Sequence, residues 1–389
     1  MGVLSIKTRF SKTKFLIFCL KEYEGFMWTL IRPDALAVLR DQKARRVLGR
    51  YFDVFQGKKP AHFLIAKTLS THYEEDDSIE DLWLLHDALL KSFTSLKKRI
   101  DDERIPLHAS SQPKQSFLDL KLELANRLLA NCHLCIRVCG VNRVNGELGW
   151  CRSDTNFPVS SIFVHTGEEP ELVPSGTIFT IGCNLRCIYC QNWAISQRIE
   201  TGKTYTPGMM ANAVEKLRKK GCRNLNMVGG DPTPWLPQWL ETFKHVTSNL
   251  ATVWNSNAYY SKESAKLLAG FADIYLLDFK YGNNACAERL SSAPTYWETC
   301  TRNHLYAKIH GELIIRVLVL PDHNQCCTQP ILQWIAKNLG SETRLNLMDQ
   351  YRPEWRAAEA PELRRRLTRK EFKVAVQFAR DVGLTNIIT

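Results

Sequence analysis

Two hydrophobic spacings divide the chain. In the first 115 residues the spacing is mainly helical, as where Leu85, Leu89, Phe93, Leu96 and Ile100 recur every three or four positions. From residue 176 onward, short strand-like runs alternate with helical patterns. We expect strands over 176–181, 224–228, 252–254, 274–279, 313–320 and 345–348. Strands that alternate with helices predict a parallel sheet with helices outside it.

Capping signals mark several helix ends. Thr206 and Pro207 suit the N-cap and first position of a helix. Thr368 and Glu371 have the capping-box spacing, and that last helix is expected to end near Gly383. A further helix is expected over 117–130, after a polar linker over 106–115.

These elements predict an α/β fold with a partial (β/α)6 barrel, because six strands are fewer than the eight of a closed barrel. We expect three regions: a mainly helical N-terminal extension over 1–115, a helix with a cysteine-rich segment over 116–175, and the α/β core over 176–389. The extension carries no recognisable chemistry.

Composition narrows the class of protein. Hydrophobic residues make up 44% of the 389 positions and charged residues 24%, which is ordinary for globular proteins. No apolar run reaches the roughly 18 residues of a membrane span, and no secretory signal is evident, so we expect a cytoplasmic protein with no membrane partner. Met27 is an alternative position for the first residue of the protein. The net charge of +12 favours solubility over nucleic-acid binding, because no compact basic stripe is present.

Seven of the thirteen cysteines fall in two tight groups. Cys183, Cys187 and Cys190 follow the first core strand with the spacing C-x3-C-x2-C. Three thiolates on one short loop suit three corners of a [4Fe-4S] cluster and leave one iron open. The alternative is zinc with a remote fourth ligand.

The second group has four cysteines. Cys132, Cys135, Cys139 and Cys151 lie close enough in sequence to form one metal site, and either zinc or an iron–sulfur cluster fits. His133 is interpreted as a neighbour of that site. The remaining cysteines, including Cys286, are expected to be structural thiols. This is also the first interpretation of the Cys326-Cys327 pair, whose position just past the strand end over 318–321 leaves a role near the site as an alternative.

The run Gly-Thr-Ile-Phe-Thr-Ile-Gly-Cys-Asn-Leu-Arg-Cys-Ile-Tyr-Cys-Gln-Asn over 176–192 resembles the radical S-adenosylmethionine (SAM) superfamily, and is most similar to its pyruvate formate-lyase activating enzyme-like branch. The resemblance extends over roughly 130–385. It is supported by Gly-Gly-Asp-Pro over 229–232, Trp-Asn-Ser-Asn over 254–257, Leu-Asp-Phe-Lys over 277–280 and Leu-Met-Asp-Gln-Tyr-Arg-Pro over 347–353.

The resemblance implies a radical SAM type of barrel, with Cys183, Cys187 and Cys190 on the cluster and Tyr189 against the adenine. Further cofactor-binding residues implied by it are Gly229, Gly230, Asp231, Asn255, Asn257, Asp278, Lys280 and Arg316. Asp231 departs from the Glu that is usual in the superfamily, and a shorter carboxylate still accepts hydrogen bonds. Alternatively, the glycine pair is a turn and Arg316 is a buried cation with a structural partner.

The implied activity is reductive cleavage of SAM to a 5′-deoxyadenosyl radical that abstracts hydrogen. The substrate class stays open between a glycyl radical enzyme that the chain activates, and a small molecule or RNA. A third alternative is a metal-stapled nucleic-acid-binding protein without catalysis. Expected partners are an electron donor such as flavodoxin or ferredoxin and a substrate protein that docks near Asp278, Lys280, Arg316 and Gln350. The first 115 residues either pack on the core, cover its opening or recruit the partner.

Overall fold

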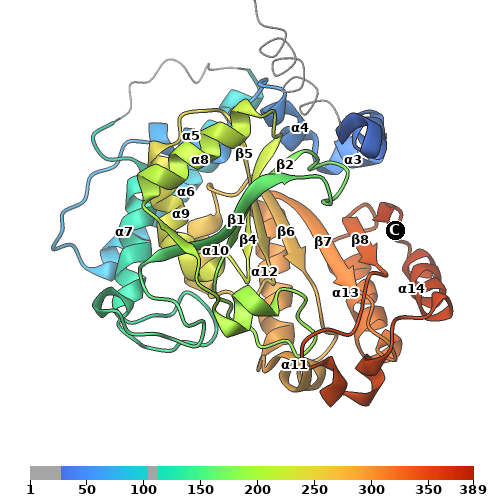
Figure 1. Cartoon of the computed structure of the whole chain (residues 1–389). Coiled ribbons are helices and arrows are strands. Elements are labelled where there is room, and N and C mark those ends of the chain that lie inside the picture. Colours follow the sequence, from blue (N-terminus) through green and yellow to red (C-terminus); the bar gives the residue numbers. More distant parts are fainter. Residues whose placement is uncertain (1–27, 104–112) are drawn as a thin grey trace, which may run out of the picture.

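The computed structural model describes residues 28–103 and 113–389 (Figure 1). The alternative start at Met27 and most of the predicted linker lie outside these residues. The helices are α2 Asp34–Ala37, α3 Gln42–Val47, α4 Gly49–Phe55, α5 His62–Thr68, α6 Ile79–Asp101, α7 Phe117–Ala130, α8 Pro207–Lys219, α9 Leu236–His245, α10 Lys262–Leu268, α11 Asn284–Ser291, α12 Tyr296–His310, α13 Gln329–Asn338 and α14 Arg369–Asp381. The strands are β1 Phe157–His165, β2 Ser175–Thr180, β3 Lys203–Tyr205, β4 Asn224–Gly229, β5 Ala251–Ser256, β6 Ile274–Asp278, β7 Glu312–Leu318, β8 Arg344–Met348 and β9 Ile387–Ile388.

All strands join one open sheet in the order β3-β1-β2-β4-β5-β6-β7-β8-β9. The strands β2, β4, β5, β6, β7, β8 and β9 pair in parallel in that order, whereas β1 is antiparallel to both β2 and β3. The partial barrel and its six predicted strands are confirmed. The sheet also contains β1, β3 and β9, which the sequence did not predict, so it begins before residue 176. Two of these strands have only two or three residues, too few to show a period.

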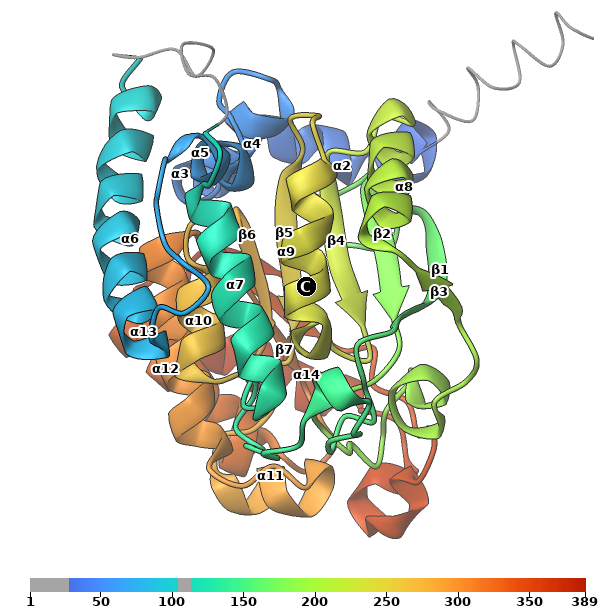
Figure 2. The same cartoon turned by 90° about the vertical axis from the view of Figure 1, so that its left-hand side faces the viewer.

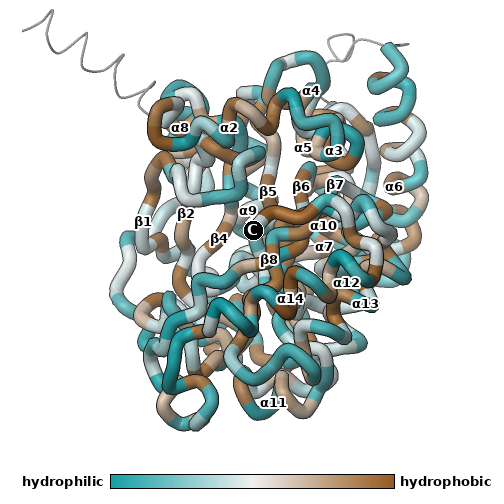
Figure 3. The backbone as a smooth tube through the Cα atoms, turned by 90° about the vertical axis from the view of Figure 1, so that its right-hand side faces the viewer, coloured by the Kyte–Doolittle hydropathy of each residue, from teal (hydrophilic) through white to brown (hydrophobic). Residues whose placement is uncertain are grey.

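The central strands are buried on both faces. Every residue of β5 is buried, as expected for a parallel strand covered by helices. Figure 3 shows hydrophobic positions along β4 and β5, while α6 alternates between hydrophobic and hydrophilic positions. That alternation matches its buried residues Leu82, His86, Phe93 and Ile100, which lie on one side of the helix.

Helices α2–α5 of the N-terminal extension pack at the starts of the strands, whereas α6 runs along the side of the barrel next to α7 (Figure 2). The side chain of Arg50 contacts Asp273, next to the first residue of β6, at 3.2 Å. The carboxylate of Glu312, the first residue of β7, accepts hydrogen bonds from the backbone of Arg50 and Tyr51 at 2.8 and 2.7 Å. Helices α2–α5 therefore close the end of the barrel opposite the carboxyl ends of the strands.

The predicted helix ends are confirmed. Thr206 caps α8 through the backbone of Met209, and a capping box joins Thr368 and Glu371 at the start of α14. A second capping box, between Ser116 and Asp119, starts α7, the helix that leads into the upstream cysteines. Within the described residues, no helix is both long and apolar enough to span a membrane.

Candidate active site

One cavity collects the residues that the sequence singled out. It has a volume of about 240 Å³ and lies at the carboxyl ends of the parallel strands. Its lining includes Cys183, Cys187, Tyr189, Cys190, Gly229, Gly230, Asp231, Asn255, Asn257, Asp278, Lys280, Arg316 and Gln350. A larger hollow of about 450 Å³ around Glu312 and Gly340 lies at the opposite end of the strands and has no cysteine in its lining. The lining residues of the smaller cavity, and not its volume, therefore identify it as the candidate active site.

The cysteine loop is fixed by backbone contacts on both sides. It starts after β2, where Gly182 adopts a positive φ of 101°. The amide groups of Arg186 and Ile188 donate to the carbonyls of Ser291 and Leu290, each at 3.0 Å. The end of α11 therefore holds the middle of the loop in place.

Each sulfur of the loop has a polar neighbour. The contacts are Leu185 N to Cys183 Sγ at 3.4 Å, Asn257 Nδ2 to Cys183 Sγ at 3.7 Å, Ser291 Oγ to Cys187 Sγ at 2.8 Å and Cys190 Sγ to Ser196 Oγ at 3.2 Å. Burial raises the pKa of the Cys183 thiol well above its usual value and that of the Cys187 thiol to about 11. These two thiols stay protonated at neutral pH until a metal displaces the protons.

A chain of hydroxyls leads from Tyr189 to the sulfur of Cys187. The hydroxyl of Tyr189 lies 2.7 Å from that of Tyr281, which contacts the hydroxyl of Ser291. Ser291 in turn donates to the sulfur. Burial raises the pKa of both tyrosines well above its usual value, so they remain neutral hydrogen-bonding groups.

The paired glycines are required by close backbone packing. A Cβ on Gly229 would lie 2.3 Å from the carbonyl oxygen of Thr180, and a Cβ on Gly230 would lie 2.2 Å from that of Gly182. Gly229 also has a φ of 150°, which side chains disfavour. No larger residue fits where β4 ends beside the start of the cysteine loop.

Asp231 ties the end of β4 to the end of β5. One carboxylate oxygen accepts from Thr233 N at 2.9 Å, and the other accepts from Ser256 Oγ at 3.0 Å and Asn257 N at 2.9 Å. Asn257 then donates to Asn184 Oδ1 at 2.7 Å, inside the cysteine loop. Both oxygens of Asp231 are thus engaged by the protein, and its contact with a cofactor remains a prediction.

Lys280 and Asp278 form an ion pair on the cavity wall, with 2.6 Å between Nζ and Oδ2. Burial favours the neutral amine, but the Asp278 carboxylate outweighs it and raises the pKa of Lys280 above its usual value. The pair therefore presents a permanent cation and a carboxylate at the end of β6.

Arg316 is held by two glutamates that the sequence analysis did not single out. Its guanidinium donates to both carboxylate oxygens of Glu169 at 2.6 Å and also contacts Glu168. A weaker contact at 3.4 Å reaches Asn255 Oδ1. Burial opposes the charged form of Arg316, but the two carboxylates raise its pKa well above its usual value. The structural partner that the sequence left open for Arg316 therefore exists.

These glutamates belong to the segment between β1 and β2, which enters the barrel. Glu171 from the same segment binds Arg344 through Oε1 at 2.5 Å, and Glu168 accepts from Asn226 at 2.9 Å. We call residues 168–171 the acidic plug. A local signal was present, since Glu-Glu-Pro-Glu is unusual just before a buried strand, but its cationic partners are distant in sequence.

The family model that matches this chain is that of the radical SAM superfamily, over residues 177–335. The match begins in β2, spans the cysteine loop and all the strand ends that line the cavity except that of β8, and ends in α13. The chain contains a radical SAM superfamily domain. It is therefore an enzyme whose cofactors are a [4Fe-4S] cluster and S-adenosylmethionine.

Two proteins of Methanocaldococcus jannaschii are similar to this radical SAM chain. The uncharacterized protein MJ0674 is 42% identical over 344 residues, which cover 87% of this chain and 98% of MJ0674. The uncharacterized protein MJ0808 is 26% identical over 251 residues, 59% of this chain and 73% of MJ0808. Crystal structures of Streptococcus suis SuiB bound to the precursor peptide SuiA and to S-adenosylmethionine align with TM-scores of 0.37 at 13% and 12% identity. Those alignments cover 53% of this chain and about half of each SuiB chain, 46% and 48%.

The cysteine loop of this radical SAM enzyme fits a cluster better than a single ion. A tetrahedral zinc ion with bonds of about 2.3 Å places its sulfur ligands about 3.8 Å apart. Among the described residues, only Cys286, His323 and Cys326 bring three such ligand atoms within 4.8 Å of one another. The sulfurs of Cys183, Cys187 and Cys190 are therefore spread more widely, as separate irons of one cluster require.

The upstream cysteines lie on a loop docked beside the active site. The carbonyl of Leu134 accepts from Ser261 N at 3.1 Å and Ser264 Oγ at 2.7 Å, after the end of β5. Burial raises the pKa of Cys135, and the nearby thiols of Cys151, Cys132 and Cys139 raise it further. The four thiols are thus neighbours in space, and their metal remains a prediction.

Arg186 connects the two cysteine groups. Its guanidinium donates to the carbonyl of Cys183 at 3.0 Å and also contacts the carbonyl of Trp150, next to Cys151. The imidazole Nδ1 of His133 lies 2.6 Å from the carbonyl of Asn131.

Proposed function

We propose that this radical SAM enzyme activates a partner protein by abstracting hydrogen from a backbone glycine of that partner. The supporting observation is that three thiols and all the residues predicted to contact SAM line one cavity at the strand ends. The choice of a glycine as substrate is supported by the resemblance of the motifs to those of activating enzymes, not by the cavity itself.

In this proposal Cys183, Cys187 and Cys190 hold the cluster. When bound, the cluster supplies one electron to the sulfonium of SAM, which yields methionine and the 5′-deoxyadenosyl radical that removes hydrogen. The chain's own contribution is to bind and orient these groups and to exclude water from them. The hydroxyl groups of Ser291 and Ser196 stabilise negative charge on the neighbouring sulfurs.

The cavity wall offers complementary groups to the zwitterionic end of SAM. Lys280 supplies a cation for a carboxylate, and the carbonyl groups around Gly229 and Gly230 supply acceptors for an amine. Tyr189 supplies an aromatic face for the adenine. Arg316 is neutralised by Glu168 and Glu169, so its charge is less available than that of Lys280.

The proposed partners follow from the same reasoning. The two edge strands, β3 and β9, do not pair with each other, so the barrel stays open. An open barrel gives room for a peptide loop near Asp278, Lys280 and Gln350. An electron donor of the flavodoxin or ferredoxin class would reduce the cluster. Since the family consists of enzymes, catalysis is favoured over a purely nucleic-acid-binding role.

The first experiment tests the cleavage of SAM. Anaerobic protein with a full cluster is incubated with dithionite and SAM, and the products are quantified by mass spectrometry. We expect methionine and 5′-deoxyadenosine in equal amounts from the wild type and from Cys222→Ala, whose buried thiol lies outside the site. Cys187→Ala should form neither product. Equal turnover by Cys187→Ala would contradict the proposed role of this loop.

The second experiment tests the substrate class. Candidate partners with glycine deuterated at the backbone carbon are added to the same mixture, followed by electron paramagnetic resonance. A glycyl radical signal on a partner, with one deuterium found in 5′-deoxyadenosine, would support the activase. Deuterium transfer from a small molecule or an RNA into 5′-deoxyadenosine, without a protein radical, would contradict the activase proposal and identify that molecule as the substrate class.

A further inference from the structure

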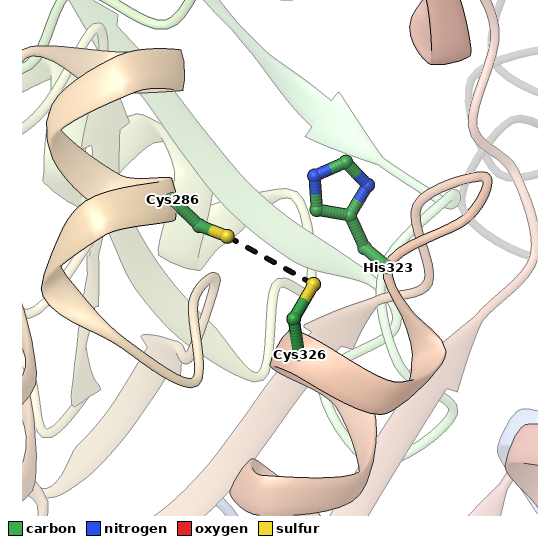
Figure 4. A group of neighbouring side chains, drawn as sticks. All are labelled: Cys286, His323 and Cys326. Atoms are coloured by element: carbon green, nitrogen blue, oxygen red, sulfur yellow. Dashed lines mark hydrogen bonds between the residues drawn. The ribbon is translucent and has the colours of Figure 1, made fainter.

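A third group of potential metal ligands lies beside the active site, on the segments that follow β6 and β7 (Figure 4). Cys286 is on α11. His323 and Cys326 come from the loop after β7, where residues Asn324–Thr328 form a π-helical turn. Such turns are rare and frequently occur at functional sites. The ligand atoms of the three residues all lie within 4.8 Å of one another.

The spacing of these atoms suits one ion. The sulfur atoms of Cys286 and Cys326 are 3.8 Å apart. A tetrahedral zinc ion with bonds of about 2.3 Å requires about 3.8 Å between two sulfur ligands. The two thiols are thus already at the separation that zinc imposes, with the imidazole beside them.

The imidazole of His323 is in the state that a metal requires. Its Nδ1 lies 2.7 Å from the carbonyl oxygen of Pro321, so Nδ1 carries the proton and the lone pair is on Nε2. A histidine ligand usually donates its other ring N–H to such a carbonyl. Arg289 now donates to Nε2 at 3.2 Å and to Glu362 at 2.6 Å. On metal binding it would release Nε2 and keep the carboxylate.

Asn283 supports both cysteines from outside the ligand set. Its side-chain amide donates to the sulfur of Cys286 at 3.4 Å and to the carbonyl of Cys326 at 2.8 Å. Its side-chain oxygen accepts from the backbone of Cys286 at 2.8 Å and caps α11. The amide therefore sets the distance between the two loops that carry the thiols.

The backbone also brings the loops together. A Cβ on Gly282 would lie 2.7 Å from the carbonyl oxygens of Cys326 and Cys327, so only glycine permits this approach. Asp322, just before His323, has a positive φ of 60°, and Arg365 holds its carboxylate at 2.7 Å. Both ligand-bearing loops are therefore fixed before any ion binds.

We propose that Cys286, His323 and Cys326 bind one divalent ion of the zinc class, with the fourth coordination position open to solvent. Two thiolates neutralise the charge of such an ion, and the neutral imidazole completes three protein ligands. Cys326 is exposed, which gives the ion a path of entry. Cys327 lies 3.9 Å from Cys326 but outside the group of three.

The ion would brace the cysteine loop from outside. α11 carries Cys286 near its start, and at its end Leu290 and Ser291 accept from the amides of Ile188 and Arg186. Fixing α11 to the turn after β7 therefore fixes the helix that holds the middle of the [4Fe-4S] loop. This site is separate from the SAM cavity, whose lining includes none of its three ligands.

Metal analysis of anaerobically purified full-length protein tests the proposal. We expect wild type and Cys222→Ala to contain one more equivalent of zinc per chain than Cys286→Ser or His323→Ala. Because the comparison is a difference between variants, zinc at the upstream cysteines does not affect it. Asn283→Ala should weaken zinc affinity about 10–100-fold. Equal zinc in all variants would overturn the proposal.

A measurement on the wild type tests the same site without depending on whether the variants fold. The protein is treated with a chelator, then with N-ethylmaleimide in the presence or absence of added zinc, and the modified cysteines are mapped by mass spectrometry. We expect zinc to slow the alkylation of Cys286 and Cys326 about tenfold or more, and that of Cys222 not at all. Alkylation unaffected by zinc, or a disulfide between Cys286 and Cys326 in the anaerobic protein, would refute the site.

Discussion

Replacement of Arg316 by methionine tests whether this residue supports the barrel or only contacts the cofactor. The side chain of Arg316 is 17% exposed, and those of Glu168 and Glu169 are 5% and 0% exposed. The change leaves two carboxylates buried without their cation. Removing one member of a buried ion pair costs about 3–5 kcal/mol, so we expect a loss of unfolding free energy in that range.

Urea unfolding, followed by circular dichroism at matched cluster content, measures this loss. Arg46→Met is the control, because Arg46 and its partner Glu342 are 60% and 51% exposed and their pair is worth less than about 1 kcal/mol. Adding Glu169→Gln to Arg316→Met should recover about 1–3 kcal/mol, because one unpaired charge is then removed. Unchanged stability of Arg316→Met with weaker SAM binding would refute the structural role.

The ion pair between Arg316 and Glu168 predicts that stability depends on pH. Burial alone would raise the pKa of the Glu168 carboxyl, but Arg316 and His165 hold it below its usual value. A carboxyl with a lowered pKa stabilises the fold at neutral pH, and this contribution is lost progressively as the pH falls from the unfolded pKa of about 4.3 through the lower folded pKa. The difference in stability between wild type and Arg316→Met should therefore shrink in acid. A difference that grows in acid would contradict this assignment.

Three further changes probe the site. Gly230→Ala should destabilise the protein by about 1–3 kcal/mol or more because of its backbone overlap, whereas Gly208→Ala, which has open space, should be neutral or stabilising in the same urea assay. Ser291→Ala removes the hydroxyl that donates to Cys187, so the cluster's reduction potential should fall in a redox titration followed by electron paramagnetic resonance; an unchanged potential would exclude this contact. Cys135→Ser should lose one metal site and speed hydrogen exchange over residues 130–155, and free alkylation of all four upstream thiols in metal-replete protein would disprove that site.

The sequence was sufficient for the barrel because each buried strand is a short hydrophobic run between turn signals. It was also sufficient to place the cysteine loop beside Gly229 and Lys280, since the carboxyl ends of parallel strands meet at one edge. The sequence indicated only in part why glycine is required at positions 229 and 230. The overlap with Thr180 depends on the register of β2 and β4, which no local pattern specifies.

Groups that meet across long stretches of chain were missed. Glu169 and Arg316 are 147 positions apart, and Glu171 and Arg344 are 173 apart. The same holds for Cys286 and Cys326, which are 40 positions apart and were interpreted as separate structural thiols. Their proximity results from the alignment of β6 and β7, so spacing along the sequence gave no indication of it.

The acidic plug also constrains the order in which the chain is assembled during synthesis. Residues 168–171 leave the ribosome long before β7 and β8, which carry Arg316 and Arg344. Until those strands emerge, Glu169 and Glu171 lack the arginines that they pair with inside the barrel, and their carboxylates remain hydrated. We therefore expect the barrel interior to close only after β7 and β8 are available, and the edge of β6 to stay unpaired until then.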